Sequence, residues 1–236
     1  MHPQIYRRFC ETKTAYLGLN SQTAKQYHAD YIPILKLVPY AKSSPQIRQA
    51  THYLKRTSHI VLSSPSSTSL FFARMKKHKQ YLRNLHYLCI GKVTLKRLLD
   101  FLPRAHYSLA TTETSEGFLP LILPLTDNTR ILYPHSSFSR PVITDFLTRE
   151  NKQFFAYSHY TVRPRDLDPS IFSPYKNIIF TSPSGVRAYT KLFSRFPNKI
   201  YWCLGPITLQ EFQKTSSSQV YLLTNADRDK APEKKI

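Results

Sequence analysis

The stretch Asn177-Ile-Ile-Phe-Thr-Ser-Pro-Ser-Gly-Val-Arg-Ala-Tyr189 decides how the rest of the chain is interpreted. Its apolar start, Ile178 to Phe180, is typical of a strand that is buried on both faces of a parallel sheet. The residues that follow are of the kinds that cap helices and shape tight turns: Thr181, Ser182, Pro183, Ser184 and Gly185. A strand-to-helix turn of this type leaves free N–H groups at the helix N-terminus, which favours an anionic ligand.

A second copy of the pattern occurs earlier in the chain. Ile60-Val-Leu-Ser-Ser-Pro-Ser66 aligns with Ile178-Ile-Phe-Thr-Ser-Pro-Ser184 at a distance of 118 positions. Cys89-Ile-Gly-Lys-Val-Thr-Leu95 aligns with Cys203-Leu-Gly-Pro-Ile-Thr-Leu209 at a distance of 114 positions. Because solenoid repeats are only roughly 20–50 residues long, this period predicts two similar domains.

The composition is strongly basic, with 34 Lys and Arg against 14 Asp and Glu and a formal net charge of +20. Such a charge implies an acidic partner, whether nucleic acid, an anionic membrane surface or a polyacidic small molecule. A bias of the source lineage toward basic proteins explains the charge equally well. No zinc-finger spacing, RNP-type aromatic signature or basic heptad occurs, so a dedicated nucleic-acid module is disfavoured.

Length and cysteine content set further bounds. A chain of 236 residues suits two small domains that each bury a core. It has no run of about 18 apolar residues, and its N-terminus lacks the apolar core of a signal peptide, so neither a membrane span nor secretion is expected. The widely spaced Cys10, Cys89 and Cys203 indicate buried reduced thiols in a cytoplasmic protein, with no metal site and no disulfide framework.

Hydrophobic periodicity and turn residues predict alternating strands and helices. Strands are expected at 15–19, 60–62, 87–90, 106–110, 131–133, 178–180, 200–204 and 220–223, with extended segments at 31–40 and 154–164. Helices are expected at 21–31, 45–57, 68–79, 93–101, 141–149, 186–196 and 207–214, and from 118 onward. The polar residues 224–236 predict a tail without a final helix. This alternation is typical of parallel α/β sheets with right-handed crossovers.

The repeats do not fall as two sequential halves. Residues 40–153 already contain a full set of strands, so the strand at 15–19 needs the sheet of the C-terminal segment. We expect a first domain of residues 1–34 plus 163–236 and an inserted second domain of residues 40–153. Residues 35–39 and 154–162 would form linker strands around one cleft.

In these motifs the chain resembles the uroporphyrinogen-III synthases, over nearly its whole length. The resemblance rests on the two Ser-Pro turns, on Leu204-Gly-Pro-Ile-Thr208, on Leu132-Tyr-Pro-His-Ser-Ser-Phe-Ser-Arg140 and on the linker segment His159-Tyr-Thr-Val-Arg-Pro164. It implies two flavodoxin-like or Rossmann-like α/β domains, joined by a two-stranded linker, with a cleft that binds the linear tetrapyrrole hydroxymethylbilane.

The resemblance also implies a reaction without cofactors. Loss of the terminal hydroxyl from ring A generates an azafulvene, and ring D attacks it through its already substituted carbon. The resulting spiro intermediate fragments and recloses with ring D inverted. The azafulvene cyclises readily without help, so the enzyme mainly has to hold ring D for the less direct attack, and such positioning supplies about 7–11 kcal/mol in favourable cases.

Tyr160 matches the linker tyrosine of that family and is the candidate general acid for the leaving hydroxyl. An aromatic side chain that merely packs the linker is the alternative. The substrate carries acetate and propionate groups on every ring, which hydroxyls, backbone N–H groups and dispersed cations can bind. The candidate binding residues lie in the turns: Ser63, Ser64, Ser136, Thr181, Ser182, Ser184, Gly185, Gly205 and Thr208. Ordinary helix capping is the alternative role of these hydroxyls and is compatible with binding.

Two other classes of function are weighed beside the synthase. A non-catalytic two-domain protein could bind a small polyanionic ligand in the same cleft. A nucleic-acid-binding protein would show an affinity that falls steeply with salt. Hydrolase, NTPase and dinucleotide-dehydrogenase motifs are all missing. The expected partners are hydroxymethylbilane and hydroxymethylbilane synthase, which could hand the substrate over, with no nucleic acid, no membrane and a monomeric state.

Overall fold

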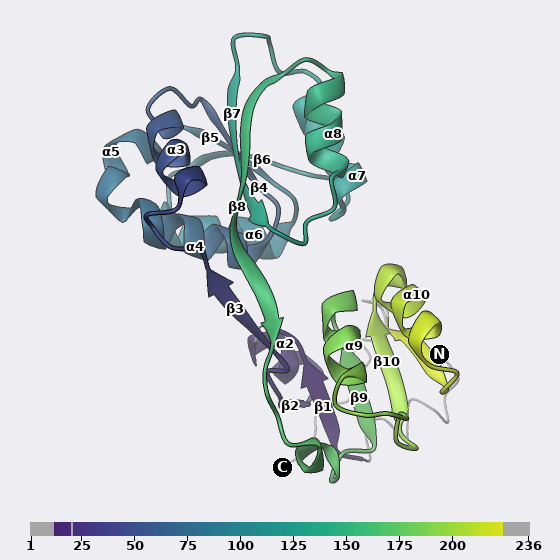
Figure 1. Cartoon of the computed structure of the whole chain (residues 1–236). Coiled ribbons are helices and arrows are strands. Elements are labelled where there is room, and N and C mark those ends of the chain that lie inside the picture. Colours follow the sequence, from purple (N-terminus) through teal and green to yellow (C-terminus); the bar gives the residue numbers. More distant parts are fainter. Residues whose placement is uncertain (1–11, 20, 224–236) are drawn as a thin grey trace. The chain divides into compact units, whose positions relative to one another are not determined.

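The computed structural model describes residues 12–19 and 21–223 (Figure 1). The chain divides into two compact units. The first unit contains the described residues up to Leu37 and those from Val162 onward, and the second unit is Val38–Thr161. Within the described ranges, no helix combines the length and the hydropathy that a membrane span requires.

The first unit is built on a sheet with the strand order β11-β10-β9-β1-β2, in which every neighbouring pair is parallel. Its strands are β1 (Thr14–Leu17), β2 (Asp30–Tyr31), β9 (Asn177–Phe180), β10 (Ile200–Leu204) and β11 (Val220–Leu223). Its helices are α2 (Ser21–Gln26), the 3-10 helix η2 (Pro169–Phe172), α9 (Pro183–Thr190) and α10 (Pro206–Thr215). Because successive strand residues face opposite sides, Ile178 and Phe180 pack with α9 and α10, whereas Ile179 packs on the face that α2 covers.

The second unit has a sheet with the strand order β3-β8-β7-β4-β5-β6. Its strands are β3 (Leu35–Pro39), β4 (His59–Leu62), β5 (His86–Cys89), β6 (His106–Leu109), β7 (Arg130–Ser136) and β8 (Gln153–Pro164). Its helices are α3 (Pro45–Leu54), α4 (Pro65–Met75), the 3-10 helix η1 (Lys76–His78), α5 (Lys79–Leu82), α6 (Lys92–Phe101), α7 (Ser115–Ile122) and α8 (Val142–Arg149).

The helices of the second unit form two layers. Helices α3 to α6 pack on the face of the sheet that carries Ile60 and Leu62, and α7 and α8 pack on the face that carries Val61 (Figure 1). The strand order β8-β7-β4-β5-β6 repeats the order β2-β1-β9-β10-β11 of the first unit. The predicted fold class, two similar parallel α/β sheets, is therefore confirmed.

Two predicted helices are partly wrong. The helix expected at 21–31 ends at Gln26, because His28 adopts a φ of 48° and turns the chain into β2. The helix expected at 186–196 spans Pro183–Thr190 instead. Phe193 and Phe196 suggested a longer helix because they are apolar, but a loop packs them against Tyr189 with ring centroids 4.7 and 5.2 Å apart.

Two of the three cysteines, Cys89 and Cys203, are buried free thiols, as the sequence predicted. Cys10 and the predicted polar tail at 224–236 lie outside the described residues.

Candidate functional site

The turn between β4 and α4 is shaped by helix capping. Ser64 has an extended backbone (φ −163°, ψ 152°), and its Oγ accepts a hydrogen bond from the backbone N–H of Ser67 at 3.1 Å. Pro65 occupies the first helical position, where its missing N–H costs nothing. The local sequence therefore fixes Ser64 at the carboxyl end of a central strand, where α/β proteins bind ligands.

Tyr160 lies beside this turn. Its side chain is only 4% exposed, and its Oη is 3.4 Å from Ser64 Oγ. The register of β7 and β8 pairs Tyr160 with Ser136. Burial raises the pKa of the Tyr160 phenol, and interactions with the hydroxyls of Ser64 and Ser136 lower it in part. The phenol is therefore protonated at neutral pH and has a proton to donate.

A β-bulge directs Tyr160 toward Ser64. His135 pairs with Ser158 and Ser136 pairs with Tyr160, so His159 is an extra residue on β8. An extra residue shifts the alternation of side chains along the strand and re-aims the residue that follows. The bulge therefore determines where the Tyr160 hydroxyl lies.

His159 is tied to the neighbouring elements from inside the core. It is fully buried, and its Nε2 lies 2.8 Å from the Oγ of Ser67, which also donates to the carbonyl of Pro134 at 2.8 Å. A serine hydroxyl has one proton, so Ser67 accepts from His159 Nε2–H while it donates to Pro134. Burial, followed by the charge of Arg74, lowers the pKa of His159 to about 3, so the imidazole is neutral.

Tyr133 provides a second phenol near the same turn. Burial raises its pKa, and interactions with Ser63 and Ser139 counteract this increase. The sequence predicted Ser63, Ser64, Ser136 and Tyr160 for this region, and the structure brings all four together in the second unit. It adds Ser67, His159 and Tyr133, which the sequence reading missed. Ser67 lies within a run of seven polar or small residues, 63–69, and the sequence does not show which hydroxyl of this run is buried.

The first unit repeats the capped turn between β9 and α9. Ser182 has an extended backbone (φ −160°, ψ 155°) and accepts a hydrogen bond from the N–H of Gly185 at 3.2 Å. Thr181 precedes it and is half-buried. Ser184 Oγ accepts from Arg187 Nη2 at 3.3 Å, so a cation and a hydroxyl lie together on the first turn of the helix.

Gly205 and Thr208 belong to the neighbouring turn of the first unit, between β10 and α10. Gly205 has a φ of +103°, which few other residues adopt. Thr208 is buried on the first turn of α10. Since β9 and β10 are adjacent and parallel, the predicted residues of the first unit lie at the carboxyl ends of two neighbouring strands: Thr181, Ser182, Ser184, Gly185, Gly205 and Thr208.

The two glycine turns differ in what occupies them. In the second unit, the backbone N–H of Lys92, just after Gly91, donates to the carboxylate of Glu113 at 2.8 Å. At Gly205, no atom of the described chain outside the two adjoining residues lies within 4 Å of the position that a Cβ would take. The turn at Gly91 is therefore filled by the chain's own carboxylate, and the turn at Gly205 is open.

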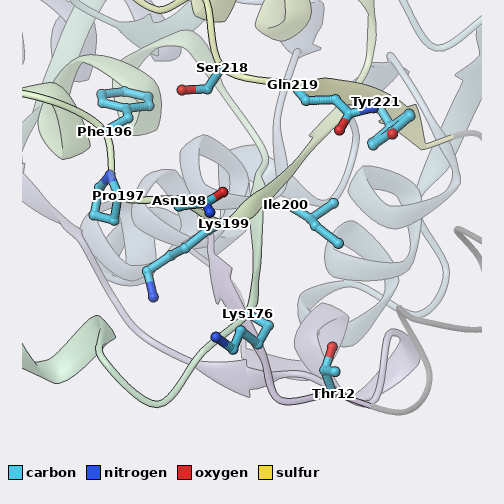
Figure 2. Close-up of a pocket in the computed structure, with 10 residues that line it drawn as sticks. All are labelled: Thr12, Lys176, Phe196, Pro197, Asn198, Lys199, Ile200, Ser218, Gln219 and Tyr221. Atoms are coloured by element: carbon cyan, nitrogen blue, oxygen red, sulfur yellow. The ribbon is translucent and has the colours of Figure 1, made fainter.

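A cavity of about 690 Å³ lies elsewhere in the first unit (Figure 2). It is formed by residues that precede or begin β9, β10 and β11, among them Lys176, Ile200 and Gln219. The cavity thus lies at the amino ends of these strands, whereas the capped turns lie at their carboxyl ends. Lys199 donates its Nζ to the carbonyls of Phe172 and Tyr175 and has a structural role there. Among the described residues, no group of three or more His, Cys, Asp or Glu could hold a metal ion.

Comparisons with known proteins identify the family and support the fold. A family model with the description "Uroporphyrinogen-III synthase HemD" matches residues 21–229. The structure is similar to a uroporphyrinogen-III synthetase from Helicobacter pylori, with a TM-score of 0.65 and 14% identity over 92% of this chain and 96% of that one. It is also similar to a mutant uroporphyrinogen III synthase from Thermus thermophilus, with a TM-score of 0.58 and 13% identity over 92% and 95% of the two chains.

A search of curated proteins finds no significant match. At 13–14% identity the two structures support the fold, and the profile supports the family because it spans most of the chain. The chain belongs to the uroporphyrinogen-III synthase family.

Proposed function

We propose that the chain carries out the reaction of its family with Tyr160 as the proton donor and the capped turns as carboxylate-binding sites. The reaction cyclises hydroxymethylbilane with inversion of ring D through a spiro intermediate, and it releases one water. It belongs to the biosynthesis of tetrapyrroles, including haem.

The close approach of Ser64 Oγ and the buried Tyr160 Oη, at 3.4 Å, carries the proposal. A phenol whose pKa is raised by burial keeps its proton until a stronger base meets it. The ring A hydroxyl takes that proton as its C–O bond breaks, and the electron pair of the bond leaves with the water. The hydroxyls of Ser64 and Ser136 then stabilise the phenolate until a proton from the closing ring restores the phenol.

The turns of both units supply groups that bind carboxylates. Each helix N-terminus presents backbone N–H groups and a partial positive charge. The turn at Gly91 already holds a carboxylate, since Glu113 accepts from Lys92 N–H at 2.8 Å. This contact supports the assignment of the corresponding open turn, with Gly205 and Thr208, to a substrate acetate or propionate. The turn of Ser182, Ser184 and Gly185 would bind another.

Positioning by His159 completes the proposed site. Its neutral ring joins α4 to β8 through Ser67, and the bulge at His159 sets the direction of Tyr160. His159 does not contact the reacting atoms in this scheme and serves as a positioning residue.

The direct test feeds freshly generated hydroxymethylbilane to the purified chain, oxidises the product and separates the type I and type III uroporphyrin isomers. An excess of type III over the spontaneous type I isomer supports the proposal. Only type I from folded protein would refute catalysis. Retained affinity for the bilane in that case would favour the alternative, a non-catalytic binder of a small polyanion.

The proposal extends to the oligomeric state of the chain, its location and the source of its substrate. We propose a monomeric cytoplasmic enzyme that receives its labile substrate from hydroxymethylbilane synthase. Light scattering coupled to size exclusion tests the monomer. A dilution series tests the transfer, because bilane that is released into solution cyclises spontaneously to type I. Direct transfer would leave the type III yield unchanged when the chain is diluted.

A further inference from the structure

The cations of the second unit are unevenly divided between the two helical layers. Residues 38–100, which form α3 to α6, contain seven lysines, five arginines and one acid, Asp100. Residues 101–161, which form α7 and α8, contain five Lys or Arg and five Asp or Glu. A general bias toward basic residues would act on both layers alike. The α3 to α6 layer therefore needs a separate explanation for its charge.

A cavity of about 400 Å³ lies within this basic layer. Its lining includes Ile47 and Thr51 of α3, the end of α4 and all of η1, and the exposed Lys76 and Lys77 form its rim. Every titratable residue in its lining is a cation or a histidine: Lys42, Arg74, Lys76, Lys77 and His78. Two separate segments, residue 42 and residues 74–78, thus bring positive charge to one cavity.

These cations are not neutralised by the described chain. None of the ion pairs among residues 12–19 and 21–223 includes Lys42, Arg74, Lys76 or Lys77. Arg74 donates through Nη2 to the carbonyl of Tyr40, and its Nη1 is buried without a hydrogen-bond partner within the described ranges. The arrangement holds like charges close together, which is unfavourable unless an anion offsets it.

We propose that this cavity binds a small phosphorylated anion. A volume of about 400 Å³ is at the lower end of the range of about 300–1,000 Å³ for ligand pockets, which suits a sugar phosphate or a mononucleotide. Lysine ammonium groups are compact point charges that suit phosphate oxygens. The apolar side chains of Ile47 and Met75 give the non-phosphate part of such a ligand a surface to contact.

The cavity is distinct from Ser64 and Tyr160, although Arg74, which lines it, also lowers the pKa of His159. Ser64 caps the first turn of α4, whereas Arg74 and Met75 are at its last turn. At 1.5 Å per residue these ends are about 15 Å apart along the helix axis. Loss of phosphate binding would therefore leave the assignment of Tyr160 intact, and the two proposals fail independently.

The test measures the binding of inorganic pyrophosphate and of ATP to the full chain by isothermal titration calorimetry. The site variant Lys76→Gln/Lys77→Gln removes two exposed cations from the rim. The control variant Lys92→Gln/Lys96→Gln removes two exposed cations from α6, in the same basic layer and with the same change in net charge. Thermal melts by circular dichroism establish that both variants are folded.

We expect saturable binding of one anion per chain, weakened about tenfold by the site variant and little changed by the control, since only the first pair faces the cavity. Binding of pyrophosphate as well as ATP would indicate a phosphate site, and binding of ATP alone a nucleotide site. No saturable binding, or an equal loss in both variants, would overturn the proposal. The chain could instead bind single-stranded RNA or anionic vesicles more tightly than these small anions, with an equal loss in both variants. That result would show that the basic layer as a whole binds polyanions.

Discussion

The two Ser-Pro turns have the same capping geometry but different neighbours. Ser64 and Ser182 differ by only 3° in φ and 3° in ψ, and both accept from the N–H three residues on, at 3.1 and 3.2 Å. The cap is therefore a property of the local sequence. What differs is the strand two places away in each sheet, which is the twelve-residue β8 in the second unit and the two-residue β2 in the first.

A single substitution within the repeat accompanies this difference. Ser67 and Gly185 are equivalent, and the strand registers place Pro134 and Leu17 at equivalent positions facing them. In the second unit the serine hydroxyl donates to Pro134 and accepts from His159. In the first unit the glycine leaves only a close approach to Leu17 O, 3.4 Å from where a Cβ would be. Both units therefore contain the capped turn, and only the second unit contains the buried polar network of Ser67, Pro134 and His159.

The largest expected effect concerns Tyr160. Tyr160→Phe should reduce the rate of type III formation by about 10²-fold or more, because the general acid is lost while the ring remains. The coupled assay measures this rate as the amount of type III isomer formed beside the spontaneous type I isomer.

Tyr157→Phe is the matched control. Tyr157 is also a buried tyrosine of β8, and its Oη has no hydrogen-bond partner within the described ranges, so its removal should leave activity and stability unchanged. Equal activity of the Tyr160 and Tyr157 variants would show that the Tyr160 hydroxyl is not the proton donor.

Ser67→Ala should lower the free energy of unfolding by about 1–3 kcal/mol. The substitution leaves the carbonyl of Pro134 and the Nε2–H of His159 buried without partners. Urea unfolding followed by circular dichroism provides the value.

The reciprocal change, Gly185→Ser, sharpens the comparison. Its Cβ meets only ordinary contacts, and serine favours a helix more than glycine does, so stability should rise by a few tenths of a kcal/mol, roughly. A large loss of stability in that variant would mean that the two turns are not equivalent.

Acid should unfold the second unit before the first. Burial lowers the pKa of His159 from 6.5 to about 3, so below pH 6.5 the unfolded chain binds a proton that the folded chain does not. Stability therefore falls as the pH falls, by about 2 kcal/mol at pH 5 for this histidine alone. Burial also lowers the pKa values of His59, His86 and His135, which all lie in the second unit.

The single tryptophan makes this order measurable. Trp202 is fully buried in the first unit, so its fluorescence follows that unit, whereas far-UV circular dichroism follows both. On acidification, the circular dichroism signal should change at a higher pH than the fluorescence. Coincident transitions would contradict the idea that buried histidines make the second unit the acid-sensitive one.

The expected effects of the caps are smaller than that of acid. Ser64→Ala and Ser182→Ala should each cost about 1 kcal/mol of stability and agree within a few tenths. Their effects on type III formation should differ, because only Ser64 lies next to the phenol of Tyr160. Glycine at the same positions should restore most of the stability without the hydroxyl. Equal effects on activity would assign both serines to the same role.

Much of this arrangement could be predicted because it is local. Apolar runs of three residues, followed shortly by Ser-Pro, determine a strand, a cap and a helix start within ten positions, and the structure contains both copies. Tyr160 was expected at the site from the resemblance alone, and its place beside Ser64 is a finding of the structure. Neither depends on the exact ends of the helices, where the predictions at 21–31 and 186–196 were wrong.

The polar network could not be predicted because it depends on register. Whether His159 is buried is decided by a one-residue bulge between β7 and β8, and a period of two along the sequence does not reveal such a bulge. The same holds for Ser67, whose hydroxyl matters only because Pro134 and His159 face it. The filling of the Gly91 turn likewise depends on Glu113, which lies about one strand and one loop further along the chain.

The two-segment composition of the first unit also affects how the chain folds during synthesis. The second unit is continuous in sequence and can form as soon as residue 161 has emerged. Strand β1 is an interior strand of its sheet, yet its partner β9 comes much later, and Asn177 bonds Thr12 across 165 residues. At about 5–20 residues per second, the N-terminal strand waits roughly 10–30 s for its partner. A circular permutant that begins near Val162 would remove this wait, and its faster refolding would show that loop closure limits the assembly of the first unit.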